Sequence, residues 1–145
     1  MPWSRRKLLL AGGGVICARA IGCGGSDQIV LPAEIPAGNS SAVTLNTLTP
    51  VAAAAAAIGR DSGGIYALTL VCTHQACDIA HSGGGSVSFS RIHCGCHGSE
   101  FNGQGLVLLG PATRNLDHLL VTADASGALT IHGDQVVAAN IRLNV

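Results

Sequence analysis

Charged and aromatic residues are scarce in this chain of 145 residues, where they make up 11% and 3% of the sequence. This low charge content, together with 48% apolar residues, excludes a disordered polyelectrolyte and favours one small folded domain. Lysine is absent after Lys7, and beyond Arg19 the chain has four arginines against eight acidic residues. That part offers no basic surface to nucleic acid, so we expect no nucleic-acid partner and a preference for cationic partners.

Long apolar runs are also lacking, which limits how the chain can meet a membrane. The run at residues 8–18 has eleven residues, whereas a transmembrane helix takes about 20. It follows the segment SRRKLL, which has the twin-arginine form, and the sequence AIGC that ends at Cys23 resembles a bacterial lipobox. We therefore expect residues 1–22 to be a twin-arginine signal peptide with a lipobox, rather than a buried N-terminal helix. Lipid on Cys23 would then tether an exported, periplasmic protein to a membrane.

The export route itself bears on function. The twin-arginine route carries proteins that have already folded, whereas general secretion threads unfolded chains. A cofactor that must be inserted in the cytoplasm before export needs the former route. The predicted signal peptide therefore already suggests a prosthetic group.

The rest of the chain is rich in short runs of strand-forming residues separated by turn residues. We expect residues 23–41 to be a tether, of which 28–41 is a linker or an edge strand, and residues 42–145 to be the domain. Alanine favours helix over strand, but the glycine and turn after the run at 52–57 suit a hairpin. We predict strands at 55–60, 65–71, 86–92, 106–109, 119–122 and 128–131. This pattern predicts an all-β fold, an antiparallel sandwich or barrel.

Four of the six cysteines and two of the histidines gather in two short segments, CTHQAC at 72–77 and CGCHGSEF at 94–101. Two disulfides, a common use of cysteine after export, would leave the histidines unexplained. A zinc site usually combines a Cys-x2-4-Cys pair with a His-x3-5-His pair, whereas each segment here mixes the two residue types. In one type of [2Fe-2S] centre two thiolates hold one iron and two imidazoles the other, which suits the mixed pairs.

These segments resemble the two boxes of Rieske iron-sulfur proteins, Cys-Thr-His-Leu-Gly-Cys and Cys-Pro-Cys-His-Gly-Ser, and the likeness runs from about Tyr66 to Leu120. The resemblance implies a Rieske-like sandwich or barrel with a small cluster-binding part at about residues 70–113, made of loops and short strands. It also implies a proline loop around Gly110 and Pro111 that shields a [2Fe-2S] cluster. By the same likeness Cys72 and Cys94 bind the inner iron, His74 and His97 bind the outer iron, and a disulfide joins Cys77 to Cys96.

Departures from the family pattern bear on the choice of partner. Ser99 keeps the hydroxyl that in the family hydrogen-bonds a cluster sulfide and raises the potential, but Phe101 stands where quinol-oxidising members usually carry tyrosine. Gln75 replaces an apolar residue that helps to pack the cluster tip against a quinol pocket. Ala76 and Gly95 replace glycine and proline, changes that we expect the loops to tolerate unless Ala76 needs a positive φ.

The remaining polar residues suggest no substrate chemistry. We expect four further histidines to be structural or exposed, and two acidic residues near the boxes to be solvated loop charges; these are His81, His93, His118, His132, Asp78 and Glu100. The sequence shows no phosphate loop, no paired carboxylates and no Ser/His/Asp arrangement.

The sequence therefore predicts an exported one-electron carrier with a [2Fe-2S] cluster. It would be an electron-transfer subunit of an oxidoreductase, and the iron-sulfur subunit of a quinol:cytochrome c reductase, with cytochrome b- or c-type partners, is the first candidate. The small Rieske subunit of a molybdenum oxidase such as arsenite oxidase is the alternative within the same class. The alternative from another class is a structural zinc domain with two cysteine and two histidine ligands.

Overall fold

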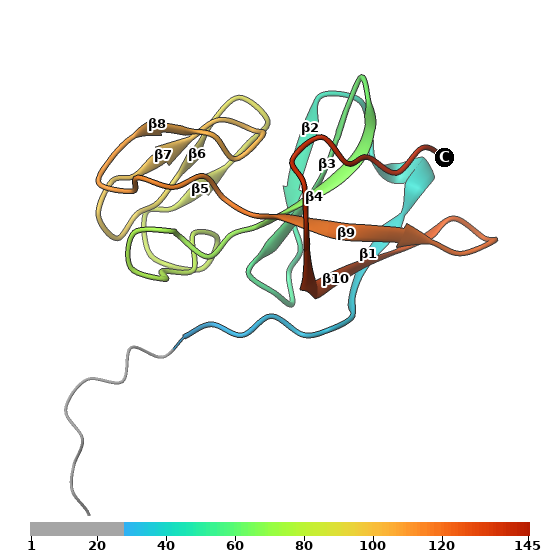
Figure 1. Cartoon of the computed structure of the whole chain (residues 1–145), viewed down its shortest axis with the longest axis horizontal. Helices are drawn as coiled ribbons and strands as arrows, with labels where there is room; N and C mark the ends of the chain where they lie inside the picture. Colours follow the sequence, from blue (N-terminus) through green and yellow to red (C-terminus); the bar gives the residue numbers. More distant parts are fainter. Residues whose placement is uncertain (1–27) are drawn as a thin grey trace, which may run out of the picture.

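The computed structural model describes residues 28–145, so the predicted signal peptide and Cys23 lie outside the described residues. The structure is nearly all β, as the sequence predicts, and its strands form two antiparallel sheets that lie side by side in Figure 1. The large sheet has the strand order β1-β10-β9-β4-β3-β2, and the small sheet has the order β5-β6-β7-β8. Among residues 28–145 there is no helix with the length and apolar character needed to cross a bilayer.

The bounds of the elements are as follows. The large sheet consists of β1 (Ile35–Asn39), β2 (Thr47–Pro50), β3 (Ala56–Asp61), β4 (Gly64–Thr69), β9 (His118–Ala123) and β10 (Ala128–Val137), and the 3-10 turn η1 (Ser40–Ala42) follows β1. The small sheet consists of β5 (Ser86–Val87), β6 (Ile92–His93), β7 (Glu100–Phe101) and β8 (Val107–Leu109).

The hairpin of β3 and β4 is the centre of the molecule, and packing overrides the helix preference of alanine there. Ala56 and Ala57 are fully buried in β3, and the whole of β4 is buried, so both faces of the hairpin are covered. A side chain at Gly59 would meet the ring of Tyr66, its partner across the hairpin, at 2.7 Å. Small residues in β3 therefore make room for the large ones in β4.

Alternation along β4 divides the core into two clusters. Tyr66, Leu68 and Leu70 point into the cluster that packs between the large sheet and the small sheet. Ile65 and Ala67 point to the opposite face, where they join apolar residues of β9 and β10. Because β4 runs directly into residues 72–77, its burial on both faces fixes the start of the first cysteine segment.

Several elements differ from the predicted ones. The strands β2 and β7 were not predicted, and β10 extends to Val137, beyond the predicted strand at 128–131. The predicted strand at 86–92 is two short strands, β5 and β6, because Ser88 accepts from the N–H of Arg91 and closes a turn between them. Part of the predicted tether is the edge strand β1, whose Ile35 is buried and pairs with Ile131 of β10. The edge-strand alternative thus holds for 35–39, and the folded part begins before the expected boundary at residue 42.

A polar network ties the C-terminal segment to the loop that follows β7. Arg142 pairs with Asp61 at 2.8 Å, donates to the side chain of Gln104 at 2.6 Å and lies over the ring of Tyr66. Burial opposes ionisation of Asp61, but the hydrogen bonds and charge around it outweigh this effect and lower its pKa. The Tyr66 hydroxyl donates to the carbonyl of Gly103 at 2.7 Å, and burial raises its pKa to about 12. The network therefore holds the small sheet in place against the large one.

Candidate metal centre

The two cysteine segments form loops with the same backbone hydrogen bonds. In the first, the N–H of Cys72 donates to the carbonyl of Cys77, and the carbonyl of Cys72 accepts from the N–H of Ala76. In the second, Cys94 makes the same two contacts with Ser99 and Gly98, at the same sequence offsets. Each loop therefore turns its first cysteine inward, where the side chain is buried.

The fifth residue of each loop adopts a left-handed backbone conformation. Gly98 has φ 79°, and Ala76 has φ 53°. Alanine carries a Cβ that is strained in this region, whereas glycine is not. The loop therefore accommodates Ala76, but the strained backbone at this residue lowers the stability of the fold.

The structure brings the predicted ligands together from the two loops. Cys72 and Cys94 are free thiols that are 3% and 1% exposed, and they lie within one apolar cluster. The rings of His74 and His97 stand edge to face, with their centroids 4.8 Å apart. Burial raises the pKa of the Cys94 thiol, and the neighbouring Cys72 raises it further. Both effects favour the protonated thiol. A bound metal cation would instead favour the thiolate, because metal ions bind and stabilise it.

One buried nitrogen supports the fit of a metal group to these residues. Nδ1 of His74 is buried and has no hydrogen-bond partner among the residues described, a costly situation for a polar atom. A metal bond at this nitrogen would satisfy it. Two buried thiols and two adjacent imidazoles are also the donor set that a Rieske-type [2Fe-2S] cluster takes.

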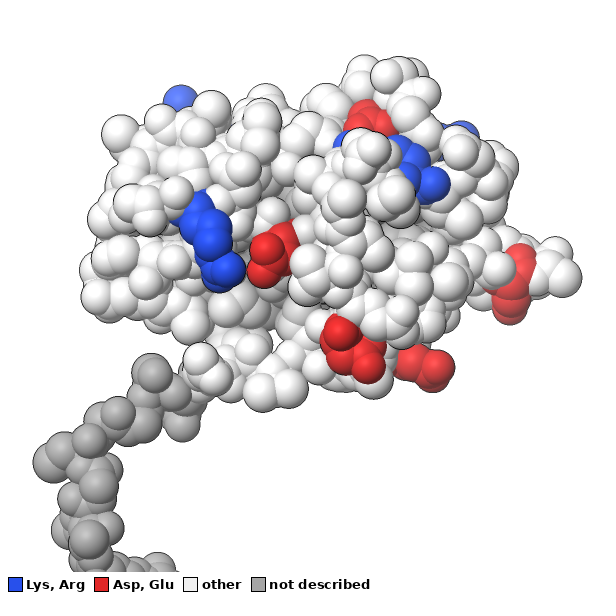
Figure 2. Space-filling view, viewed as in Figure 1, with Lys and Arg blue, Asp and Glu red and all other residues white. Residues whose placement is uncertain are grey.

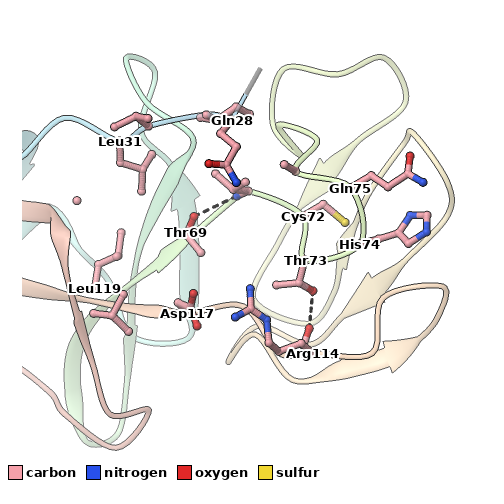
Figure 3. Close-up of a pocket in the computed structure, with 16 residues that line it drawn as sticks. Gln28, Leu31, Thr69, Cys72, Thr73, His74, Gln75, Arg114, Asp117 and Leu119 are labelled. Atoms are coloured by element: carbon pink, nitrogen blue, oxygen red, sulfur yellow. Dashed lines mark hydrogen bonds between the residues drawn. The ribbon is translucent and has the colours of Figure 1, made fainter. Parts of the chain in front are cut away.

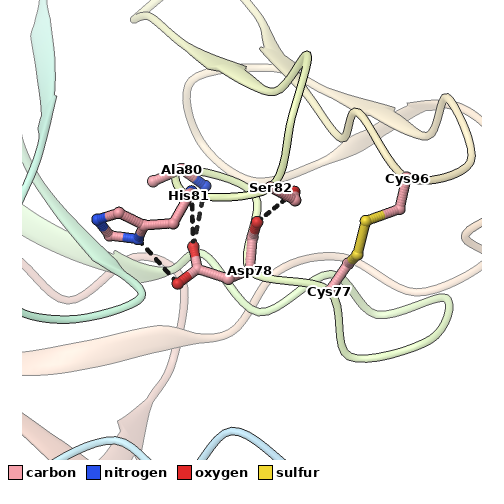
Figure 4. Close-up of a disulfide and its surroundings, with 6 residues drawn as sticks. All are labelled: Cys77, Asp78, Ala80, His81, Ser82 and Cys96. Carbon is pink, nitrogen blue, oxygen red and sulfur yellow. Dashed lines mark hydrogen bonds and ion pairs between the residues drawn. A yellow bond between two sulfur atoms is a disulfide. The ribbon is translucent and has the colours of Figure 1, made fainter.

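A disulfide joins the two loops through Cys77 and Cys96, as the resemblance implies (Figure 4). Their Cα atoms are 6.7 Å apart. The sulfur atoms of Cys77, Cys94 and Cys96 lie within 4.8 Å of one another, but this group is no ligand set because two of its members are in the disulfide. The cross-link instead keeps the two ligand-bearing loops face to face.

The charges beside the disulfide are paired rather than freely solvated. The carboxylate of Asp78 contacts Nδ1 of His81 at 2.8 Å and accepts from the N–H groups of Ala80 and His81 (Figure 4). Glu100 lies 3.5 Å from both Arg91 and His93. These groups shape the turns around the two loops and do not enter the centre.

A third loop closes over the second one. The side chain of Ser99 is fully buried, and its Oγ accepts from the N–H of Ala112 at 3.0 Å, directly after the exposed Gly110 and Pro111. Phe101 is fully buried in the cluster that contains both free cysteines. The proline segment therefore lies against the second loop, and Ser99 attaches it to the loop of His97.

Sequence reasoning missed how the three glycines at 83–85 pack. A Cβ on Gly95 would lie 2.2 Å from the carbonyl oxygen of Gly83, so the two backbones touch. A larger residue at position 95, including the proline of the family pattern, does not fit this chain. The run of three glycines is the sequence signal for this close backbone contact.

A groove of about 700 Å³ lies beside the first loop, between residues 28–31 and the segment around Arg114 (Figure 3). Asp117 and Leu119 form part of its wall on the side of the large sheet. Thr73 donates from Oγ1 to the carbonyl of Arg114, which ties the first loop to the segment after the proline loop. Together with the disulfide and the Ser99 contact, this bond holds all three loops together.

The comparison with protein families agrees with this geometry. The model of the Rieske [2Fe-2S] domain matches residues 30–123, so the chain belongs to that family and its cofactor is a [2Fe-2S] cluster. The cytochrome b6-f complex iron-sulfur subunit of Synechococcus sp. (strain JA-3-3Ab) is 36% identical over 66 residues, which are 44% of this chain and 36% of that protein. Subunit 2 of Synechocystis sp. (strain ATCC 27184 / PCC 6803 / Kazusa) is 37% identical over 68 residues, or 46% of this chain and 36% of that protein. The match thus spans about a third of the length of these relatives.

A human protein and a solved structure also match parts of the chain. A putative human cytochrome b-c1 complex subunit Rieske-like protein 1 is 46% identical over 48 residues, which are 32% of this chain and 16% of that protein. Among solved structures, a quaternary ammonium Rieske monooxygenase matches with a TM-score of 0.51 and 20% identity over 74% of this chain and 33% of its own. At this identity the structural likeness shows the fold alone.

Proposed function

We propose that the chain is an exported one-electron carrier in which Cys72 and Cys94 hold one iron and His74 and His97 the other. The observation that supports this proposal is the repeated loop geometry, together with two buried free thiols that neighbour each other and two imidazoles that stand edge to face. When bound, the cluster supplies a site that accepts and releases a single electron. The chain would keep the thiolate side dry and leave the imidazole side accessible, because both cysteines are buried and His97 is exposed.

The surrounding residues would set how readily the centre accepts an electron. Ser99 already accepts a hydrogen bond from Ala112, so its own hydroxyl proton is free to donate to a cluster atom. Phe101 contributes no hydroxyl at its fully buried position. We propose a midpoint potential below that of family members with tyrosine there, because one fewer donor stabilises the reduced, more negative centre less.

The relatives guide the choice of partner. The curated matches are subunits of cytochrome b6-f and b-c1 complexes, which supports a membrane quinol-oxidising complex as the donor and a c-type cytochrome as the acceptor. The second candidate is the small Rieske subunit of a molybdenum oxidase. The observation that favours it is the absence of a hydroxyl at Phe101. For the place of action we propose the periplasmic face of a membrane, with twin-arginine export and a lipid on Cys23, on the strength of the N-terminal sequence.

The ligand assignment is tested with a pair of histidine variants. His97→Gln should abolish the characteristic spectrum of the reduced centre and lower the iron content. His93→Gln, a change one residue before the second loop at a histidine that contacts Glu100, should retain both. A His97→Gln protein that keeps the wild-type spectrum would refute the assignment, as would loss of the spectrum in both variants.

A further inference from the structure

An apolar patch borders the centre on the side of the small sheet. It consists of Leu106, Leu108, Leu109 and Pro111, which we call the leucine patch. The three leucines are 45%, 54% and 57% exposed, and Pro111 is exposed as well. Contiguous exposed apolar residues of this size on a small protein usually mark a contact surface.

The geometry of β8 explains why these side chains face solvent. β8 is the edge strand of the small sheet, and within residues 28–145 it pairs with β7 alone. The register shifts between the pairs Glu100–Leu109 and Phe101–Val107, so Leu108 is an extra residue in the strand. Such a bulge redirects side chains, and here two successive leucines are exposed while Val107 turns inward.

The patch is continuous with the centre. Leu109 is followed by Gly110 and Pro111, and the next residue, Ala112, binds Ser99 in the loop of His97. His97 itself is exposed, so the patch and the accessible imidazole belong to one end of the small sheet. In Figure 1 the proline segment lies at the free end of this sheet, away from the large sheet.

Few charged residues lie at this end of the molecule. Between residues 71 and 113 only Asp78, Arg91 and Glu100 carry formal charge, and Arg91 and Glu100 lie 3.5 Å apart. The exposed Arg114 follows the proline segment. In Figure 2 the acidic residues lie on the large sheet and along its border with the small one, while basic residues lie on the small-sheet side as well. A charge on the opposite face would be buried here without a partner, which costs free energy. An uncharged face therefore favours a partner whose face is also uncharged.

We propose that the leucine patch is the docking face for a redox partner protein whose cofactor is surrounded by an apolar, uncharged rim. The inference rests on the proposed function, because it takes the end that holds His97 as the point of electron exchange. Burial of the leucines would supply the affinity, and the scarcity of charge would make association insensitive to salt. This partner chemistry differs from the cationic partner that the net charge of the chain favours.

The test compares a patch variant with a matched control. Leu108 and Leu109 are both changed to Gln, while Leu45→Gln serves as the control because Leu45 is 58% exposed in the turn before β2. Each reduced holoprotein is mixed with membranes from source cells that lack the chain, and oxidation of the iron centre is followed by absorbance at low and high salt. Hexacyanoferrate(III), a small oxidant that needs no docking face, is used in parallel.

We expect the patch variant to react about tenfold more slowly with membranes and at the wild-type rate with hexacyanoferrate(III). The Leu45→Gln protein should match the wild type with both oxidants, and high salt should leave the wild-type rate with membranes nearly unchanged. Equal rates for all three proteins with membranes, no membrane reaction of the wild type, or a steep fall at high salt would refute the docking face.

Two further outcomes would give the patch to another occupant and overturn the proposal. One is a wild-type dimer in sedimentation analysis that the patch variant loses, and the other is wild-type binding to phosphatidylcholine vesicles that the variant loses. Failure of the proposed function looks different from all of these. In that case the wild type holds no iron and does not react with hexacyanoferrate(III).

Discussion

Ala76 and Gly98 occupy the same position in the two loops, and only one of them is suited to it. Both have positive φ, which costs a residue with a Cβ about 1–2 kcal/mol, partly offset in the unfolded chain by the greater freedom of glycine. We predict that Ala76→Gly raises the free energy of unfolding by about 0.5–1 kcal/mol. Urea denaturation of the holoprotein measures it.

Gly98→Ala is the matched control. No atom lies within 4 Å of the Cβ that this change adds, so backbone strain alone should lower stability by about 1 kcal/mol. If Ala76→Gly lowered stability, or if Gly98→Ala left it unchanged, the left-handed geometry of the loops would be wrong.

Phe101 is the residue that most directly bears on the potential. It is fully buried in the cluster that also contains Cys72 and Cys94, and Phe101→Tyr adds one hydroxyl at this buried site. We predict a higher midpoint potential in redox titration, because a hydroxyl that donates to a ligand thiolate stabilises the reduced centre. An unchanged potential with lower stability would show that the hydroxyl is buried without reaching a thiolate.

At the scale of elements, His118 at the start of β9 makes stability depend on pH. Burial lowers its pKa below the ordinary value of 6.5, the carbonyl of Gln104 opposes this shift, and Arg142 adds to it. The unfolded chain therefore takes up a proton at a higher pH than the folded chain does. Stability from neutral His118 is complete above about pH 6.5 and is lost as the pH falls toward the lower folded-state pKa.

Urea denaturation between about pH 7.5 and pH 5 checks this expectation. The wild type should lose stability over this range, and His118→Gln, whose amide can still donate to Gln104, should lose less. A variant with the same pH dependence as the wild type would show that another group causes it.

Most strands were predictable because alternating apolar residues between turn signals are compatible with few secondary structures other than a strand. The hairpin of β3 and β4 was placed within one or two residues despite the alanines, since Gly59 and the turn at 61–64 identified it. β1 was left undecided and the strand at 86–92 was not divided. In both cases the deciding contact lies far along the chain or in one side chain: β1 pairs with β10, and Ser88 closes the turn.

The gathering of the cysteine and histidine side chains in two facing loops was predictable because the two boxes have specific spacing. The packing of Gly95 against Gly83 was not, because it joins segments that no local pattern relates. The network around Arg142 was missed for the same reason, since Asp61, Tyr66 and Gln104 lie far from Arg142 in the sequence.

At the scale of the whole molecule, the proposed export and the proposed lipid anchor can be tested together. Replacement of Arg5 and Arg6 by lysine should leave the precursor in the cytoplasm, because the twin-arginine route reads the arginine pair. Cys23→Ser should permit export but release the protein from membranes, because the lipid would be its anchor. Cell fractionation followed by immunoblotting measures both. Normal export of the lysine variant, or membrane binding that persists without Cys23, would contradict the respective part.

The account as a whole depends on the four ligands sharing one cluster. The most direct measurement is electron paramagnetic resonance of the purified, dithionite-reduced protein together with its iron and acid-labile sulfide content. We predict about two irons and two sulfides per chain and a signal whose average g value lies below that of the free electron. A protein that holds stoichiometric zinc and gives no signal would contradict the account.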